Sequence, residues 1–213
     1  MLFNNIPTIY INLERRKDRN ESVLKELSKI EITNPIRLNA IEMKNGAIGC
    51  SLSHIKCIET AINNNYDYVM ICEDDIEILN PEIFLENINK FLNSDIDWDV
   101  VLIAGNNMVP YNFVTDYCIK IYNCLTTTGY IVKKKYYSTL LNNFKDGVKN
   151  LLKEQSNSSY RIDKYWQILQ NKDNWYMLIP PSIIQKEDYS DIEKKITNFK
   201  NYMLNFNKKV IKK

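Results

Sequence analysis

The stretch YVMICEDDIEIL, Tyr68–Leu79, decides the fold prediction for this chain. Its first half is a short, nearly continuous apolar run, which is typical of a strand covered on both faces of a sheet. Three adjacent carboxylates, Glu73, Asp74 and Asp75, end this run, and apolar residues then resume. Neighbouring carboxylates raise one another's pKa unless a cation neutralises them. The stretch therefore predicts a buried strand whose carboxyl end carries a charged site.

Strands and amphipathic helices alternate on either side of this stretch. The sequence predicts strands at residues 7–13, 35–40, 68–72 and 98–105, and helices that begin near Asp18, Leu52 and Pro81. Apolar residues three or four positions apart indicate the helices, and β-branched or aromatic runs indicate the strands. This alternating order predicts an α/β fold, a three-layer sandwich with a mostly parallel central sheet.

The composition, with 45% hydrophobic and 25% charged residues among 213, is that of an ordinary globular protein. A formal net charge of +2 gives no reason to expect a nucleic-acid partner. No apolar run approaches the roughly 18 residues of a membrane span, and the start of the chain lacks a signal-peptide pattern. Five cysteines without a CxxC pair indicate reduced thiols. Together these features predict a cytoplasmic protein.

The three carboxylates have a position and a spacing that suit a metal site. Ligands of open parallel sheets bind beyond the carboxyl ends of the strands. In an extended chain Glu73 and Asp75 share one side, and Asp74 takes the other. Mn²⁺ or Mg²⁺ prefers such oxygen ligands and also bridges substrate phosphates. An acidic loop that points into water, or that caps the next helix, is the alternative.

Five motifs, in this order, resemble glycosyltransferase family 25 from about Ile9 to Ile192: INLERRKDR, GCSLSH, EDDIEI, TTTGY and PPSIIQKEDYSDI. That family includes lipooligosaccharide galactosyltransferases, collagen hydroxylysine galactosyltransferases and giant-virus relatives. The resemblance implies a GT-A fold with a Rossmann-like nucleotide-binding half. It also implies a UDP-hexose donor, with galactose the default and glucose the alternative. It further implies a Mn²⁺ ion, with Mg²⁺ as the alternative, and transfer with inversion at the anomeric carbon.

The resemblance assigns roles to the acid motif and to the first strand. It implies that Asp75 and Glu73 form the metal site, Asp75 ligating the ion that bridges the diphosphate. Whether Glu73 or Asp74 instead binds the ribose or a metal-bound water stays open. Asn12 is expected to contact the uracil. Of the arginines that follow, Arg15, Arg16 and Arg19, the resemblance favours Arg19 for phosphate, and a solvent-exposed helical turn is the alternative.

Other matched positions are expected to line the donor site. The resemblance implies that His54, the only histidine, positions phosphate or the donor sugar, whereas a helix-surface histidine is the alternative. Thr127 and Thr128 are expected near the sugar, although threonines also suit a plain strand. The remaining donor-side candidates are Ala40, Gly49, Ser53, Gln185 and Ser190. Ser190 is also a candidate cap of a final helix, with Glu193 as its capping-box partner.

An inverting transferase needs a general base that deprotonates the acceptor hydroxyl. The resemblance indicates Asp163, with Asp173 and Glu187 as competing carboxylates. Asp is also favoured as a helix N-cap, which is the alternative role for Asp163.

The sequence predicts one domain over residues 1–213. Residues 1 to about 105 form the expected nucleotide-binding half, about 106–190 the acceptor half, and 191–213 a basic amphipathic helix. The lysines of this helix are either a solvated face or a contact with an anionic membrane.

The predicted reaction is hexose transfer to a hydroxyl of lipooligosaccharide or of a collagen-like hydroxylysine, in a bacterial or viral cytoplasm. A non-catalytic sugar-nucleotide-binding module is one alternative. A metal-dependent phosphoryl or nucleotidyl transferase is another, although the chain has no P-loop motif and no second tight acid cluster.

Overall fold

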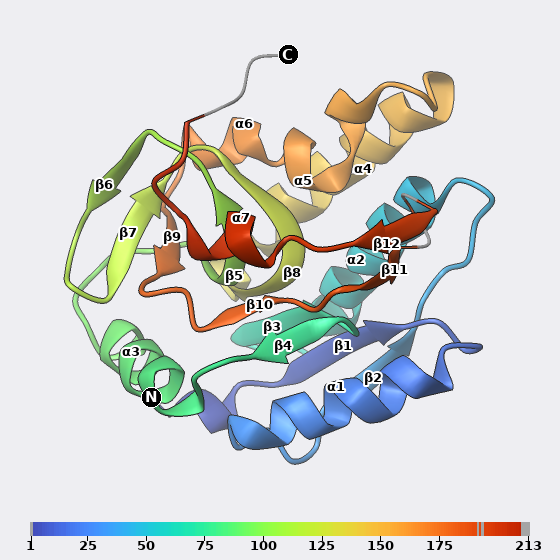
Figure 1. Cartoon of the computed structure of the whole chain (residues 1–213). Coiled ribbons are helices and arrows are strands. Elements are labelled where there is room, and N and C mark those ends of the chain that lie inside the picture. The colour runs from blue at the N-terminus through green and yellow to red at the C-terminus, as the bar shows by residue number, and fades with distance from the viewer. Residues whose placement is uncertain (1, 191, 193, 210–213) are drawn as a thin grey trace.

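The computed structural model describes residues 2–190, 192 and 194–209. Within these residues an eight-stranded sheet has the order β2-β1-β3-β8-β5-β9-β7-β6 (Figure 1). Its strands are β1 (Thr8–Asn12), β2 (Ile36–Asn39), β3 (Tyr68–Glu73), β5 (Val100–Asn107), β6 (Tyr111–Phe113), β7 (Cys118–Ile121), β8 (Cys124–Lys133) and β9 (Trp175–Leu178). Two small antiparallel pairs join β4 (Ile76–Ile78) to β10 (Ile183–Gln185), and β11 (Asp188–Ser190) to β12 (Lys195–Thr197).

Helices cover both faces of the large sheet (Figure 1). One face carries α2 (Gly46–Asn63), α4 (Tyr137–Lys153), α5 (Ile162–Tyr165) and α6 (Gln167–Gln170). The other carries α1 (Lys17–Lys29), α3 (Pro81–Leu92) and α7 (Lys200–Leu204). Short 3₁₀ turns occur at Phe3–Asn5, Lys134–Tyr136 and Ser158–Tyr160. None of the helices in the described part of the chain combines the length and the apolar character of a membrane span.

Strand β3 shows how the layers form. Side chains alternate along an extended strand, so Ile71 enters the core beneath α2 and α4, whereas Met70 and Cys72 enter the core beneath α1 and α3. All three side chains are completely buried. The predicted three-layer α/β sandwich is confirmed, and its sheet is continuous across the two predicted halves of the chain.

The sheet is mixed, which corrects the prediction of a mostly parallel one. β1 is parallel to β2 and β3, and β5 is parallel to β9. β8, however, lies between β3 and β5 and is antiparallel to both. Parallel neighbours need a long crossover, usually a helix, but the segment between β5 and β8 contains only the short strands β6 and β7. The chain therefore re-enters the sheet in the opposite direction.

The predicted C-terminal helix over 191–213 is wrong for the described residues. The segment forms β12 and then the five-residue α7, and residues 191, 193 and 210–213 lie outside the description. Its expected apolar stripe divides, because Ile196 is 68% exposed on the hairpin while Met203 is completely buried. The ammonium group of Lys208 donates to backbone carbonyls, including those of Asn205 and Tyr202. No long basic helix is therefore present, in the described part, to lie on a membrane.

Candidate active site

The acid motif lies where parallel strands end. Because β1 is parallel to both β2 and β3, Glu73 at the end of β3 and Ala40 directly after β2 reach the same edge of the sheet. Two neighbouring cavities open there, a small cavity of about 210 Å³ and a large cavity of about 560 Å³. Glu73, Cys50, Gln185 and Ser190 line both of them. These residues therefore form the junction between the cavities.

Asp74 is held by two donors from the N-terminal segment. The Asn12 side-chain amide donates to Oδ2 at 2.7 Å, and Arg19 Nη1 donates to Oδ1 at 2.9 Å. Burial raises the pKa of Asp74 above its ordinary value, although Arg19 opposes this rise. Asn12 is almost completely buried, accepts from Arg37 and lines neither cavity. The geometry thus makes Asn12 an anchor for Asp74, and because Asn12 also lines a separate cavity of about 320 Å³, its contact with a uracil stays a prediction.

Asp75 has one oxygen in use and one free. Oδ2 accepts from Gln185 Nε2 at 3.0 Å and from Arg19 Nη1 at 3.4 Å. Oδ1 is buried, and no described residue donates to it. Burial, followed by the charge of Glu73, raises the pKa of Asp75 to about 7. A buried oxygen without a partner is exceptional in a native protein, and a cation is one group that satisfies it.

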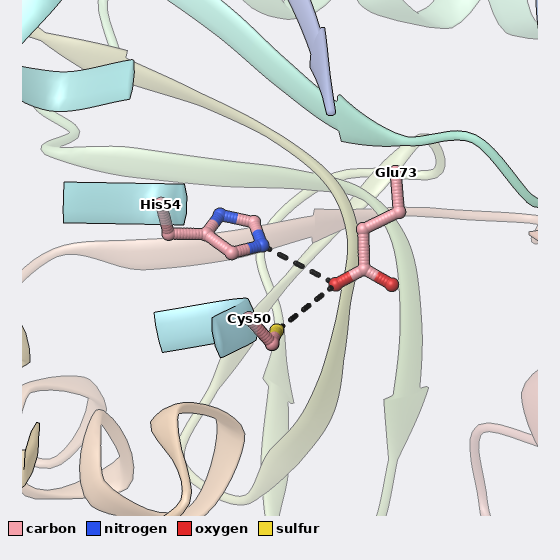
Figure 2. A group of neighbouring side chains, drawn as sticks. All are labelled: Cys50, His54 and Glu73. Atoms are coloured by element: carbon pink, nitrogen blue, oxygen red, sulfur yellow. Dashed lines mark hydrogen bonds and ion pairs between the residues drawn. The ribbon is translucent and has the colours of Figure 1, made fainter. Parts of the chain in front are cut away.

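Glu73 also has two unequal oxygens (Figure 2). Oε1 is the acceptor for Thr127 Oγ1 at 2.5 Å, His54 Nε2 at 3.2 Å and Cys50 Sγ at 3.8 Å. Burial alone would raise the pKa of Glu73, but the bonds from His54 and Thr127 hold that pKa below its ordinary value. Glu73 is therefore the ionised member of the pair that it forms with Asp75.

Together the two carboxylates fit a hard divalent cation. Asp75 offers the unpartnered Oδ1, and the contacts of Glu73 within the described residues all fall on Oε1, which leaves Oε2. Oxygen donors of this kind suit Mn²⁺ or Mg²⁺, which usually keep several positions for water and phosphate. The residues present thus fit the metal that the sequence predicted.

Two of the predicted arginines lie beside the acid motif. Arg16 Nη2 and Arg19 Nε each lie 2.7 Å from Oδ2 of Asp188, and Arg19 Nη2 donates to the carbonyl of Tyr189. Partial burial would raise the pKa of Asp188, but the hydrogen bonds from Arg16, Tyr189 and Arg19 lower it to about 2. Arg15, Arg16 and Arg19 all line the small cavity. Positive charge is therefore concentrated on one of its walls.

Gly49 and Ser53 shape another wall of the small cavity. Ser53 Oγ accepts from the backbone N–H of Ile41 and donates to the carbonyl of Gly49, both at 2.8 Å. A Cβ atom at Gly49 would collide with the carbonyl oxygen of Ile41. Both residues therefore hold the loop after β2, which includes Ala40, against α2. In the structure, Gly49 and Ser53 therefore pack closely against this loop.

The large cavity brings β8 and α5 together. The backbone N–H of Thr126, a residue with a φ of 70°, donates to Asp163 Oδ2 at 3.3 Å. Burial, followed by the charge of Glu73, raises the pKa of Asp163, although the Thr126 bond opposes the rise. Asp163 and Thr127 line this cavity, whereas the hydroxyl of Thr128 is buried without a described partner. Asp163 lies within α5, so the alternative N-cap role belongs to Arg161 instead.

The sequence itself matches a known family over more than half its length. The model of glycosyltransferase family 25, described as an LPS biosynthesis protein, matches residues 35–149. The chain belongs to glycosyltransferase family 25. The match includes the acid motif, His54, Thr127 and Thr128, and it ends before Asp163. No curated protein matches the sequence.

Solved structures show which fold this family 25 chain adopts. One is the glycosyltransferase involved in glycosylation of the major capsid of PBCV-1, with a TM-score of 0.52, 11% identity, and coverage of 94% of this chain and 89% of the other. Another is the glycosyltransferase GlyE of Streptococcus pneumoniae TIGR4, with a TM-score of 0.52, 10% identity, and coverage of 93% and 59%. At such identities the likeness shows the fold alone, which is that of GT-A glycosyltransferases.

The fold gathers most of the predicted site residues of this family 25 chain at the two cavities. His54 lines the small cavity, but its ring has no exposed surface and both nitrogens are occupied by Glu73 and Tyr130, whereas Asn12 and Thr128 line neither of the two cavities. Two of the competing carboxylates lie elsewhere: Asp173 accepts from Tyr136, and Glu187 accepts from Asn198. Asp163 is thus the candidate base that lines a cavity. Ser190 lies in β11 rather than at a helix start, and its proposed partner Glu193 is outside the described residues.

Three residues at the site had no assigned role in the sequence. Asp188 organises the arginines, Tyr130 contacts His54, and Asn106 places an unpartnered buried Oδ1 at the large cavity. Asp188 and Tyr130 both lie within motifs that resemble the family, QKEDYSDI and TTTGY, which was the available signal. Asn106 lies outside these motifs, and nothing in the sequence around it indicated a role at the site.

Proposed function

We propose that this family 25 glycosyltransferase moves a hexose from a UDP-sugar to an acceptor hydroxyl, with inversion and with a divalent metal. One observation carries the proposal: Oδ1 of Asp75 is buried with no partner among the described residues, and Asp75 lines the small cavity beside Glu73. A carboxylate oxygen in that state favours a bound cation. Because the chain belongs to a glycosyltransferase family, we assign this cation to glycosyl transfer.

Asp75 Oδ1 and Glu73 Oε2 are the proposed metal ligands. When bound, Mn²⁺ or Mg²⁺ neutralises the charge that develops on the UDP leaving group. Asp74 does not share this role, because Asn12 and Arg19 already occupy both of its oxygens. Asp74 instead holds Arg19 against the acid motif.

The small cavity is the proposed site of the nucleotide. Arg16 and Arg19 supply a fixed, forked positive charge that suits a diphosphate. Ala40, Gly49 and Ser53 also line this cavity, where Gly49 and Ser53 hold the loop after β2 in place. Gln185 holds Asp75 from the side of β10, and Ser190 closes the junction.

The large cavity is the proposed site of the sugar and the acceptor. Asp163 takes the proton of the acceptor hydroxyl as the oxygen attacks the anomeric carbon and the bond to UDP breaks. The raised pKa of Asp163 suits a general base, since a carboxylate with a higher proton affinity takes up the hydroxyl proton more readily. The N–H of Thr126 holds one oxygen of this carboxylate, which leaves the other for the hydroxyl.

The donor hexose is galactose, with glucose as the alternative, in line with the family resemblance. The acceptor is a saccharide, since the family is described as taking part in LPS biosynthesis. A collagen-like hydroxylysine is the competing acceptor.

The proposal is tested by measuring UDP release from a panel of UDP-sugars, with and without Mn²⁺, for the wild type and Asp75→Asn. Metal-dependent release from one donor, abolished by Asp75→Asn, is the expected result. UDP binding without turnover on any donor or acceptor would favour the non-catalytic module. Phosphate or pyrophosphate release from a nucleoside triphosphate would favour phosphoryl or nucleotidyl transfer. Failure to bind UDP with any divalent metal would contradict the proposed function.

A further inference from the structure

Three donors converge on a single oxygen of Glu73. Thr127, His54 and Cys50 all donate to Oε1, and none of the described residues donates to Oε2. Figure 2 shows the contacts of His54 and Cys50 with Oε1. The donors come from β8 and from two successive turns of α2, so the carboxylate is fixed by hydrogen bonds from both the strand and the helix. An oxygen that already accepts three hydrogen bonds has little capacity left for a further ligand.

The proton positions behind this arrangement follow from Tyr130. Its hydroxyl is completely buried, and within the described chain its hydrogen-bond partner is His54 Nδ1 at 3.0 Å. A buried hydroxyl proton without an acceptor is strongly unfavourable, so Tyr130 donates to Nδ1. The imidazole then carries its proton on Nε2, and that N–H donates to Oε1 of Glu73.

We propose that Tyr130 and His54 are positioning residues that orient Glu73 for the reaction. Tyr130 sets the tautomer of His54, and His54 saturates Oε1 together with Thr127 and Cys50. Oε2 is thereby left as the oxygen that Glu73 offers to the cavities. This inference rests on the proposed function, because it gives the free Oε2 its purpose as a metal ligand beside Asp75.

The same cluster has an alternative as a metal site of its own. The ligand atoms of Cys50, His54 and Glu73 lie within 4.8 Å of one another, and these residue types also bind Zn²⁺. A metal on Nε2 would force the imidazole proton onto Nδ1, towards the Tyr130 oxygen. The Tyr130 hydroxyl proton would then lose its acceptor inside the core. The buried contact with Tyr130 therefore favours orientation of Glu73 over metal binding by this cluster.

The tautomer can be measured directly, because His54 is the only histidine in the sequence. Tag-free protein labelled with ¹⁵N-histidine gives one imidazole, whose protonated nitrogen is identified by long-range ¹H–¹⁵N correlation. The expected wild-type spectrum shows Nε2 protonated and Nδ1 bare. Tyr130→Phe is expected to mix the tautomers. Tyr137→Phe is the matched control, since that hydroxyl is buried without a described partner. Protonated Nδ1 in the wild type, or an unchanged spectrum in Tyr130→Phe, would overturn the inference.

Mn²⁺ affinity in the presence of UDP tests the consequence for the site. His54→Gln keeps an N–H near the Nε2 position, whereas His54→Asn places its amide near Nδ1. We expect affinity to stay within about threefold for His54→Gln and to fall about tenfold or more for His54→Asn. Equal affinities would overturn the positioning role.

Two controls separate this inference from the proposed function. If the wild type binds no Mn²⁺ with UDP, the metal-dependent function fails, and the ¹⁵N spectrum still decides the tautomer. Co²⁺ alone is the probe for the competing cluster. A cobalt–thiolate absorption band in the wild type that Cys50→Ser removes would overturn the assignment of Cys50 and His54 as donors to Glu73.

Discussion

Arg19 Nε lies 2.7 Å from Oδ2 of Asp188, although the two residues are 169 positions apart in the chain. This contact joins the first helix to the last hairpin directly beside the acid motif. The same guanidinium also donates to Asp74 through Nη1. Arg19 is therefore shared between Asp74 of the acid motif and Asp188 of the hairpin.

Replacing Asp188 by Asn is expected to tighten UDP binding. The change removes a negative charge from Arg16 and Arg19, which then interact fully with the diphosphate. For a partly exposed ion pair the expected gain is about threefold in Kd. Isothermal titration calorimetry of UDP provides the measurement. Asp18→Asn is the matched control, because Asp18 pairs with Arg16 on the exposed side and contacts the backbone of Arg19 but not its guanidinium. Weaker binding in Asp188→Asn would show that Asp188 organises the arginines without competing.

Asp75→Asn is expected to stabilise the metal-free protein at pH 8. The pKa of Asp75 is raised to about 7 in the folded state, so the folded state binds more protons than the unfolded state between about pH 4 and 7. Stability is therefore lost as the pH rises through this window. We expect a gain of roughly 4 kcal/mol for Asp75→Asn at pH 8, which corresponds to a shift of about three pKa units, and none near pH 4.

Urea unfolding at the two pH values, with a chelator present, provides the measurement for Asp75→Asn. Adding Mn²⁺ and UDP is expected to stabilise the wild type more than the variant, since only the wild type retains both carboxylate ligands. A variant that is less stable than the wild type at pH 8 without metal would contradict the prediction.

Thr127→Val and Thr128→Val are expected to differ, although the residues are neighbours in β8. The Thr127 hydroxyl donates to the ionised Glu73, and its loss is expected to cost about 2 kcal/mol of unfolding free energy. The Thr128 hydroxyl is buried without a described partner, so its replacement by a methyl group is expected to be neutral or stabilising. The unfolding free energies of both variants, measured by urea denaturation, test this difference. Equal losses would mean that the contact with Glu73 contributes nothing specific.

Asp163→Asn is expected to lower kcat by about 10²–10⁴-fold while leaving UDP affinity unchanged. Below the raised pKa of Asp163 the base is protonated, so the wild-type kcat/KM is expected to fall as the pH decreases. Glu187→Gln is the control, because Glu187 contacts Asn198 and does not line the cavities. A pH profile of UDP release with acceptor present provides the measurement. Full activity in Asp163→Asn would remove Asp163 from the mechanism.

The local features of this protein were readable from the sequence. The acid motif follows an apolar run. Predicting the strand, and the carboxylates at its end, required only residues that are neighbours in the sequence. The helices α1, α2 and α3 were predicted because their apolar residues recur with helical spacing. The order of the motifs then placed Thr127, Asp163 and Gln185 near the donor and acceptor, and the fold does bring them to the two cavities.

The C-terminal segment shows where periodicity fails. Ile196 and Met203 have the spacing of a helical stripe, but one lies on an exposed hairpin and the other is buried against β10 and β5. Tertiary packing overrides a weak helical preference when separate parts of a segment find different neighbours. The direction of β8 was likewise decided by the connection that precedes it and not by its own residues.

The sequence by itself determined that three carboxylates end a buried strand, because that requires only the order of residues along the chain. Only the tertiary structure decided what each carboxylate does. Asp74 meets Asn12 and Arg19, Asp75 keeps a bare oxygen, and Glu73 turns one oxygen to His54. These partners come from distant segments, and burial removes the water that would otherwise make the three side chains equivalent. Their distinct roles therefore arise from packing.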